Sequence, residues 1–126
     1  HTEKARAVLP ASYVRSDVVH NIGAVSFLMA AFMYNKPEYL KFGLDDHVHV
    51  PYRLGLIPGS EEVIRSSVKA GAYGATISGS GPTIIAFSPS DKAHLVGESM
   101  VSTFKHHGIT SSYIVLDFDQ SGISAV

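Results

Sequence analysis

The chain has 126 residues, which is the size of one domain. Hydrophobic residues make up 45% and charged residues 17%, a balance that allows a core and excludes a disordered protein. Ten Lys and Arg against eleven Asp and Glu leave a net charge of −1, which predicts neither nucleic acid nor a membrane surface as partner. The absence of Cys excludes disulfide scaffolds, thiol catalysis, zinc fingers and iron–sulfur clusters, and it fits a reducing compartment.

The start of the chain and its longest apolar stretch give expectations about a leader, a membrane span and processing. The residues up to Arg6 are polar, so we expect no secretory leader. The longest apolar stretch, from Ile22 to Tyr34, is shorter than the ~20 residues that span a bilayer, and we interpret it as part of a buried helix. Because the chain begins directly in a helical pattern and without Met, we expect it to be processed or part of a larger protein.

The first half of the chain has mainly helical patterns. Thr2 suits the cap of a short helix that ends before Pro10. A longer helix is predicted from Ser16 or Asp17 to about Tyr34. Its apolar residues recur at helical spacing, which places these side chains on one face: Val18, Ile22, Val25, Met29 and Phe32.

Shorter helices are expected after this one. The first covers 37–43, since proline suits the first turn of a helix and glycine its end. Asp45 or Asp46 can start the second. A loop rich in glycine and proline then leads to a third helix over 61–70.

The second half predicts strands and one long helix. Strands are expected over 73–78 and 83–87, and the short loop between them favours an antiparallel hairpin. A helix from Ser90 to about His107 and a third strand, Tyr113–Phe118, follow. This order predicts an α+β fold, a two-layer sandwich with helices on one face of a small, mainly antiparallel sheet. Three strands make a thin sheet, so a further strand is expected upstream of His1.

The loop between the predicted strands has the sequence Ser-Gly-Ser-Gly-Pro. Two glycines so close together let backbone N–H groups converge on an anion, or simply allow a tight turn, and both interpretations stay open. The loop lacks the common phosphate-binding patterns, because Ser80 stands where the P-loop needs Lys and Ile84 where the dinucleotide pattern needs Gly. It also fails the Gly-x-Ser-x-Gly pattern of a hydrolase nucleophile.

Three polar residues form a candidate clamp for an anion. Thr2 and Arg6 are four residues apart and share a helix face. A hydroxyl beside a guanidinium can hold a carboxylate or phosphate, and Arg53 could supply a second guanidinium. The alternative is that Thr2 caps its helix and both arginines form surface ion pairs.

Seven histidines raise the question of a metal site. His47 and His49 share a face only on a strand, and no third ligand stands near them, so we predict no metal site. His106 and His107 suit the last turn of a helix through their interaction with its dipole. Capping and strand-end solvation explain the paired carboxylates, which receive no catalytic role: Asp45, Asp46, Asp117 and Asp119.

Several segments together resemble a known family. Residues 74–83 (GATISGSGPT), followed by an apolar strand, resemble the third motif of the GHMP kinases, which phosphorylate small molecules such as galactose, homoserine and mevalonate. Residues 2–10 (TEKARAVLP) and 46–57 (DHVHVPYRLGLI) are similar to segments of the homoserine kinases within that superfamily. Residues 116–119 (LDFD) resemble the end of the same family, so the resemblance covers nearly the whole chain.

The resemblance implies roles for residues of this chain. Thr2, Arg6 and Arg53 match positions that contact the amino-acid substrate, which favours the clamp over surface pairing. The glycine-rich turn matches one that packs against the nucleotide phosphate loop and helps to shape that site: Ser78, Gly79, Ser80 and Gly81. The cofactors implied are ATP and Mg²⁺, bound mainly by an N-terminal domain. No catalytic base is assigned.

The resemblance also implies a whole enzyme of which this chain is a part. Homoserine kinases are roughly twice as long, so residues 1–126 would be the C-terminal domain, of ferredoxin-like fold, without the ATP-binding domain. The parent would transfer a phosphoryl group from ATP to L-homoserine, giving O-phospho-L-homoserine for threonine biosynthesis in the cytoplasm. Because phosphoryl transfer needs nucleotide, metal and acceptor in line, we expect this chain alone to be inactive.

Two other functions remain open from the sequence. The first is a GHMP kinase with another acceptor, although a neutral polyol would not need both Arg6 and Arg53. The second is a non-catalytic, ferredoxin-like module that binds an amino acid and regulates another protein, because small α+β sandwiches serve many functions. In each case a homodimer through the sheet or the long apolar helix is plausible.

Overall fold

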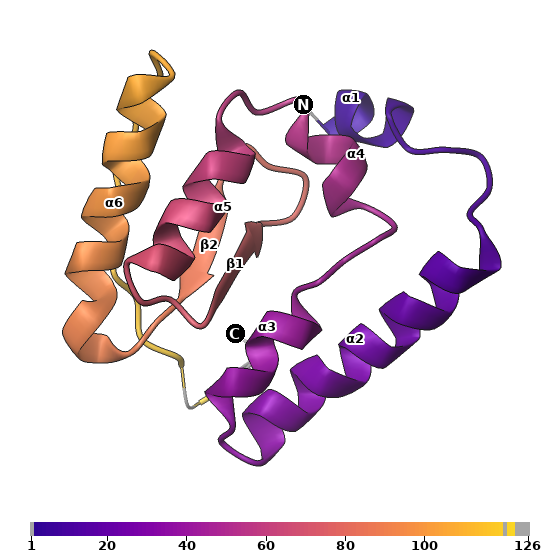
Figure 1. Ribbon diagram of the computed structural model, residues 1–126, viewed down its shortest axis with the longest axis horizontal. Helices are drawn as coiled ribbons and strands as arrows, with labels where there is room; N and C mark the ends of the chain where they lie inside the picture. The colour runs from indigo at the N-terminus through magenta and orange to yellow at the C-terminus, as the bar shows by residue number, and fades with distance from the viewer. Residues whose placement is uncertain (1, 120, 123–126) are drawn as a thin grey trace.

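The computed structural model describes residues 2–119 and 121–122 and has an α+β fold (Figure 1). Two strands, β1 (Gly74–Ile77) and β2 (Ile84–Phe87), form its antiparallel sheet. The helical elements run in chain order as follows: α1 (Thr2–Ala7), α2 (Arg15–Met33), η1 (Pro37–Tyr39), α3 (Leu40–Gly43), α4 (Val50–Leu54), α5 (Ser60–Lys69), η2 (Ser90–Lys92) and α6 (Ala93–His106).

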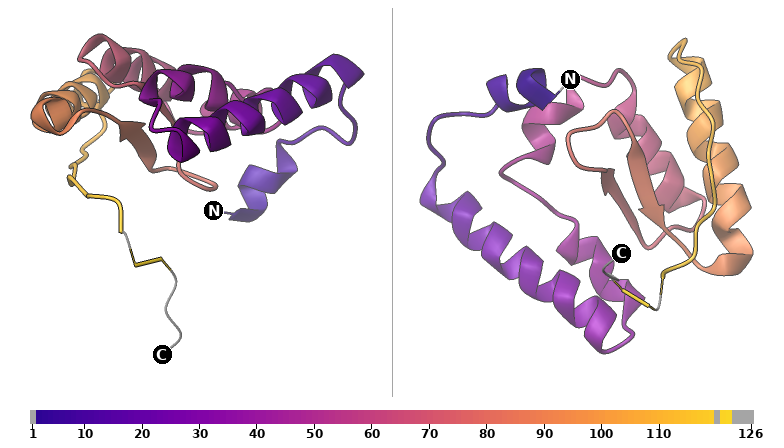
Figure 2. Two further views of the ribbon diagram at one scale, coloured as in Figure 1. Left: turned by 90° about the horizontal axis from the view of Figure 1, so that it is seen from below. Right: turned by 180° about the vertical axis from the view of Figure 1, so that it is seen from behind.

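The predicted hairpin is confirmed in position and direction. Gly74 pairs with Phe87 and Ile77 with Ile84, so the ladder begins and ends where the apolar pattern does. The Ser78 N–H then donates to the Thr83 carbonyl at 2.8 Å and closes the loop. Helices α5 and α6 lie in a layer on one face of this hairpin (Figure 2, left), as the two-layer prediction requires.

The core lies between the hairpin, α5 and α6. Helix α5 turns Val63 and Ser67 inward, both with no measurable exposure, while its charged residues face solvent. Helix α6 contributes Val96, and β1 contributes Ala75 and Ile77. Small side chains at the contact let the two helices approach closely, and the polar ones are hydrogen-bonded.

The predicted third strand, Tyr113–Phe118, is wrong: the sheet of the described residues consists of β1 and β2, and this segment is not one of its strands. Ring contacts of its side chains hold it against the rest of the fold. The Tyr113 ring lies against Gly97 of α6, and the Phe118 ring stacks on Phe87 with 6.1 Å between centroids. Because alternation reports only which side chains face inward, it cannot distinguish a paired strand from such a segment.

Helix α2 is much more exposed than the buried helix that the sequence predicted. Only Ala24 and Ala31 are buried among its residues. It contacts η1 and α3, where the Phe27 ring packs against Tyr39 and Phe42. The apolar residues that share one face by spacing are all exposed, by 42–65%: Val18, Ile22, Val25, Met29 and Phe32.

Two further properties of α2 follow from its composition. Its apolar residues are spread around much of its circumference, which is typical of helices buried on several sides, and among its residues only Ala24 and Ala31 are buried. By length and composition alone, α2 is long and apolar enough to cross a membrane. Core helices of soluble proteins meet the same two criteria.

Candidate functional site

Arg53 connects three segments that lie far apart in the sequence. It belongs to α4, and its Nε donates to the carbonyl of Ala5 in α1 at 3.2 Å. Its Nη1 donates to the carbonyl of Gly79, in the loop between the strands, at 3.1 Å. A guanidinium carries five N–H donors in a fixed plane, so these two bonds orient the group and leave donors for an anion.

The glycine-rich loop uses its two glycines for different purposes. Both have positive φ, +59° at Gly79 and +77° at Gly81, which glycine adopts at little cost. A Cβ at Gly81 would lie 2.7 Å from Cδ1 of Ile57, so this residue allows close packing beneath the loop. A Cβ at Gly79 would meet nothing within 4 Å, so there the backbone faces open space.

Asp46 organises the segment that leads into α4. Its carboxylate accepts hydrogen bonds from the N–H groups of Val48, His49 and Val50, and from the Asn21 amide of α2 at 2.6 Å. Partial burial raises the pKa of Asp46, but these hydrogen bonds outweigh it and hold the pKa below its ordinary value. The predicted helix start at Asp45 or Asp46 is four to five residues early: α4 begins at Val50 with His49 as its N-cap, and Asp46 holds the backbone that leads into it.

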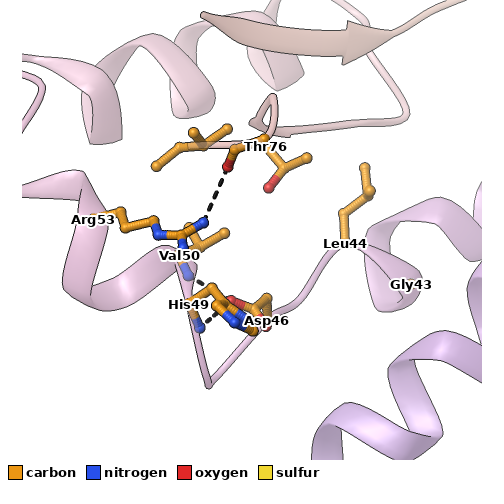
Figure 3. A pocket seen from close by; sticks show the side chains of 9 residues that line it. Gly43, Leu44, Asp46, His49, Val50, Arg53 and Thr76 are labelled. Atoms are coloured by element: carbon orange, nitrogen blue, oxygen red, sulfur yellow. Dashed lines mark hydrogen bonds and ion pairs between the residues drawn. The ribbon is translucent and has the colours of Figure 1, made fainter. Parts of the chain in front are cut away.

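A hollow of about 360 Å³ opens between these elements (Figure 3). Arg53, His49 and Asp46 border it on one side, with Thr76 of β1 and Leu44 beyond α3 facing them. It therefore combines a cation, an anion and a hydroxyl with an apolar wall, as small-molecule sites do. Its complete lining is Gly43, Leu44, Asp46, His49, Val50, Arg53, Thr76, Ile77 and Gly79.

The sequence-predicted clamp is only partly assembled around the hollow. Arg53 lines it, whereas Thr2 and Arg6 are exposed on α1 and lie outside the described lining. The bond from Arg53 to Ala5 nevertheless holds α1 beside α4, as Figure 1 shows. Within the predicted turn, Gly79 borders the hollow, while Ser78, Ser80 and Gly81 lie next to it in the loop.

Sequence reasoning assigned no functional role to several residues that line the hollow. The sequence predicts a capping role for Asp46; in the structure His49 is the N-cap of α4, and the Asp46 carboxylate holds the backbone N–H groups before the helix. The signal that could have found Asp46 is its short, fixed spacing to Arg53 along the chain. His49, Thr76 and Leu44 carry no comparable local signal, since β1 and α3 meet α4 only in three dimensions.

A second polar cluster lies away from the hollow. His20 of α2 comes together with Asp45 and His47, and their potential ligand atoms all lie within 4.8 Å of one another. The sequence analysis found no third ligand near His47, because His20 is distant along the chain.

Comparison with known proteins adds a family to this geometry. The family model described as "GHMP kinases C terminal" matches residues 33–106, more than half of the chain. The chain belongs to the GHMP kinases. The matched region includes α4, the hairpin and the glycine-rich loop, so it contains the hollow and Arg53.

Similar proteins within this family include homoserine kinases. The chain is 39% identical over 125 residues to a homoserine kinase of Desulfitobacterium hafniense, covering 99% of this chain and 42% of the relative. It is 44% identical over 121 residues to one of Carboxydothermus hydrogenoformans, covering 96% and 39%. The chain thus spans about two fifths of the length of these relatives.

A solved structure supports the fold. The crystal structure of a homoserine kinase from Cytophaga hutchinsonii is similar to this chain with a TM-score of 0.80 and 34% identity. The match covers 84% of this chain and 34% of that one. The predicted α+β architecture of a GHMP kinase C-terminal domain is thereby confirmed.

Proposed function

We propose that this chain is the C-terminal part of a homoserine kinase, which phosphorylates the side-chain hydroxyl of L-homoserine with ATP to give O-phospho-L-homoserine. The observation that carries the proposal is Arg53, which joins α1, α4 and the glycine-rich loop in one hydrogen-bonded unit. The names of the relatives and of the solved structure support the same acceptor.

The substrate carboxylate would be held by the arginines. Arg53 is oriented by its two backbone acceptors, and α1 presents Arg6 and Thr2 on the neighbouring helix. Arginine suits this task because its fork gives two parallel hydrogen bonds to a carboxylate. Asp46 borders the same hollow, and its low pKa keeps it anionic, which suits the substrate ammonium group.

The glycine-rich loop would support the nucleotide side of the reaction. Its backbone is open to space at Gly79 and closely packed at Gly81, so it offers a rigid surface to a phosphate-binding loop. ATP and Mg²⁺ would be held mainly by the N-terminal part that the longer relatives possess. This chain would position the acceptor through Arg53, Arg6 and Thr2. Catalysis would then rest on this positioning and on the stabilisation of the transferring phosphoryl group's charge by the whole enzyme.

The fragment character has two consequences. Without the nucleotide-binding part, the chain alone would release no ADP from Mg-ATP and L-homoserine. The exposed apolar surface of α2 would be covered by that N-terminal part, because the relatives have more than half of their length outside the match. The complete enzyme would act in the cytoplasm, in threonine biosynthesis.

A fusion tests the proposed function. The matched C-terminal region of the Carboxydothermus hydrogenoformans enzyme would be replaced by this chain, and ADP release with Mg-ATP would be recorded for L-homoserine, mevalonate, galactose and shikimate. We expect turnover with L-homoserine alone. Turnover with another acceptor would place the chain with a different GHMP kinase and remove the carboxylate role of Arg6 and Arg53.

The alternative function, a regulatory module that binds an amino acid without catalysis, leads to a different expected result. Such a module would bind an amino acid tightly without nucleotide and without the N-terminal part. Calorimetric titration of this chain with L-homoserine therefore separates the two functions. We expect weak binding or none, because the site is assembled from both parts; tight binding together with an inactive fusion would favour the module.

A further inference from the structure

Three side chains converge on the side of α2 that faces the loop between α3 and α4. His20 lies on α2, and Asp45 and His47 lie on the loop. His20 Nε2 is 3.1 Å from Asp45 Oδ2, and His47 Nε2 is 3.8 Å from Asp45 Oδ1. The side chains are 38–56% exposed, so the cluster is accessible to an ion from solvent.

The loop is fixed on α2 by bonds that do not involve these three side chains. Asn21 accepts a hydrogen bond from the His47 N–H at 2.7 Å and donates one to Asp46 Oδ1 at 2.6 Å. Asp46 in turn holds the backbone of the next residues. The cluster is therefore positioned by the fold, which lowers the entropic cost of bringing three ligands together.

Asp17 supplies the outer partner that a metal-binding histidine needs. Its Oδ1 lies 3.3 Å from Nδ1 of His47. A hydrogen bond there places the proton on Nδ1 and leaves the Nε2 lone pair free on the side of Asp45. Metal-bound histidines commonly donate their other ring N–H to a carboxylate in this way.

We propose that His20, Asp45 and His47 form a binding site for a divalent transition metal ion such as Zn²⁺. Two imidazoles and one carboxylate favour zinc, cobalt, nickel or copper over Mg²⁺, which prefers oxygen ligands. Three protein ligands leave a further position for water. The proposal does not depend on the kinase function, because these side chains do not line the hollow.

Binding requires a small rearrangement of the rings. The imidazoles of His20 and His47 stack with 3.8 Å between centroids and 14° between planes. Two parallel rings cannot both direct a lone pair at one ion, so the His20 ring has to turn about its χ2 angle and release the hydrogen bond that its Nε2 donates to the Asp45 carbonyl at 3.0 Å. The potential ligand atoms lie within 4.8 Å of one another and would have to close to the ~3.3 Å expected around tetrahedral zinc.

The ion would join α2 to the segment that carries Asp46 and, further on, Arg53. It would thereby link a helix with few buried side chains to the residues that border the hollow. We therefore expect it to stabilise the chain. The competing explanation of the cluster is a pair of histidine–aspartate ion pairs that bind no metal.

Cobalt titration of the untagged, full 126-residue chain tests the proposal. Tetrahedral or five-coordinate Co²⁺ with nitrogen ligands absorbs visible light, and added Zn²⁺ should abolish the absorption by displacement. We expect one ion per chain and a rise in melting temperature with Zn²⁺ but not with Mg²⁺. His20→Asn, Asp45→Asn and His47→Asn should each weaken binding by more than the ~10–100-fold expected for Asp17→Asn, an outer-partner variant.

The double variant His106→Asn/His107→Asn is the matched control, because it removes two histidines from the chain without touching the cluster. It should keep the affinity and the cobalt spectrum. Loss of binding in this control, unchanged binding in the three ligand variants, or no cobalt absorption in the parent chain would each overturn the proposal. In the last case the cluster is a set of ion pairs only.

Discussion

The hairpin with α5 and α6 and the region around α2 are two differently built parts of one chain. In the first, apolar side chains face one another: Val63 has no exposure and Val96 is 3% exposed. In the second, apolar side chains of similar size face outward, with Val25 58% exposed and Met33 71%. The comparison shows that the first part encloses a core of its own, whereas α2 has the composition of a core helix and is covered by the described residues on only part of its surface.

The sharpest test of this difference is a pair of equal truncations. Val63→Ala removes two methyl groups from the closed core and should lower the free energy of unfolding by about 2–3 kcal/mol. Val25→Ala removes the same groups from an exposed helix face and should change it by less than about 0.5 kcal/mol. Urea unfolding of both variants measures the two values. Equal losses would show that α2 is as well packed as α5.

A second variant tests how the C-terminal segment is attached to the complete part. A Cβ on Gly97 would lie 2.3 Å from Cδ2 of Tyr113, so Gly97→Ala must displace the ring or move α6. We expect a loss of about 2 kcal/mol from overpacking, measured by thermal unfolding. Gly23→Ala is the control, because a Cβ there meets nothing within 4 Å and alanine favours the helix. A neutral result at Gly97 would mean that the segment is not packed there.

Asp46 joins α2 to the segment that leads into α4, and its removal should have a smaller, pH-dependent effect. Burial raises the pKa of Asp46, but the hydrogen bonds from Val50, Asn21, His49 and Val48 together lower it by more. The pKa in the folded chain therefore lies below the ordinary value of 3.8. The carboxylate therefore stabilises the fold above pH 3.8, and this contribution is lost as the pH falls through the lower, folded-state pKa.

Asp46→Asn should cost about 1–3 kcal/mol at pH 7, because the carboxylate accepts hydrogen bonds at both oxygens and the amide would replace one of these acceptors with a donor. The variant should approach the stability of the parent chain at pH values below the folded-state pKa. Unfolding free energies measured by urea from pH 2 to pH 7 give both curves. A constant difference between them at all pH values would show that the Asp46 charge does not contribute.

The local parts of the fold and site could be predicted from the sequence, and the long-range parts could not. The hairpin follows from an apolar run on each side of a glycine turn, although β2 is less buried than β1. Arg53, which the motif singles out, lines the hollow. The third strand failed because Tyr113 and Phe118 are held by ring contacts, which share the alternation of a paired strand. The exposure of α2 could not be predicted. Apolar composition indicates that a helix packs against other elements, but it does not show whether this chain contains those elements.

The site shows the same division. The hydrogen bonds from Asp46 to the backbone before α4 are local, whereas its place opposite Thr76 depends on how α4 meets β1. The cluster of His20 with Asp45 and His47 depends on α2 packing against a loop that is distant in sequence.

The most direct test of the account is the KM for L-homoserine in the fused enzyme carrying Arg6→Ala. Arg6 is exposed on α1, so its loss should leave the fold intact, whereas Arg53 also holds the glycine-rich loop. Arg65→Ala is the matched control, because Arg65 only pairs with Glu61 on the surface of α5. We expect the KM to rise about 10–150-fold for Arg6→Ala, the loss of a charged carboxylate contact, and to stay unchanged for Arg65→Ala. An unchanged KM in Arg6→Ala would contradict the proposed carboxylate site.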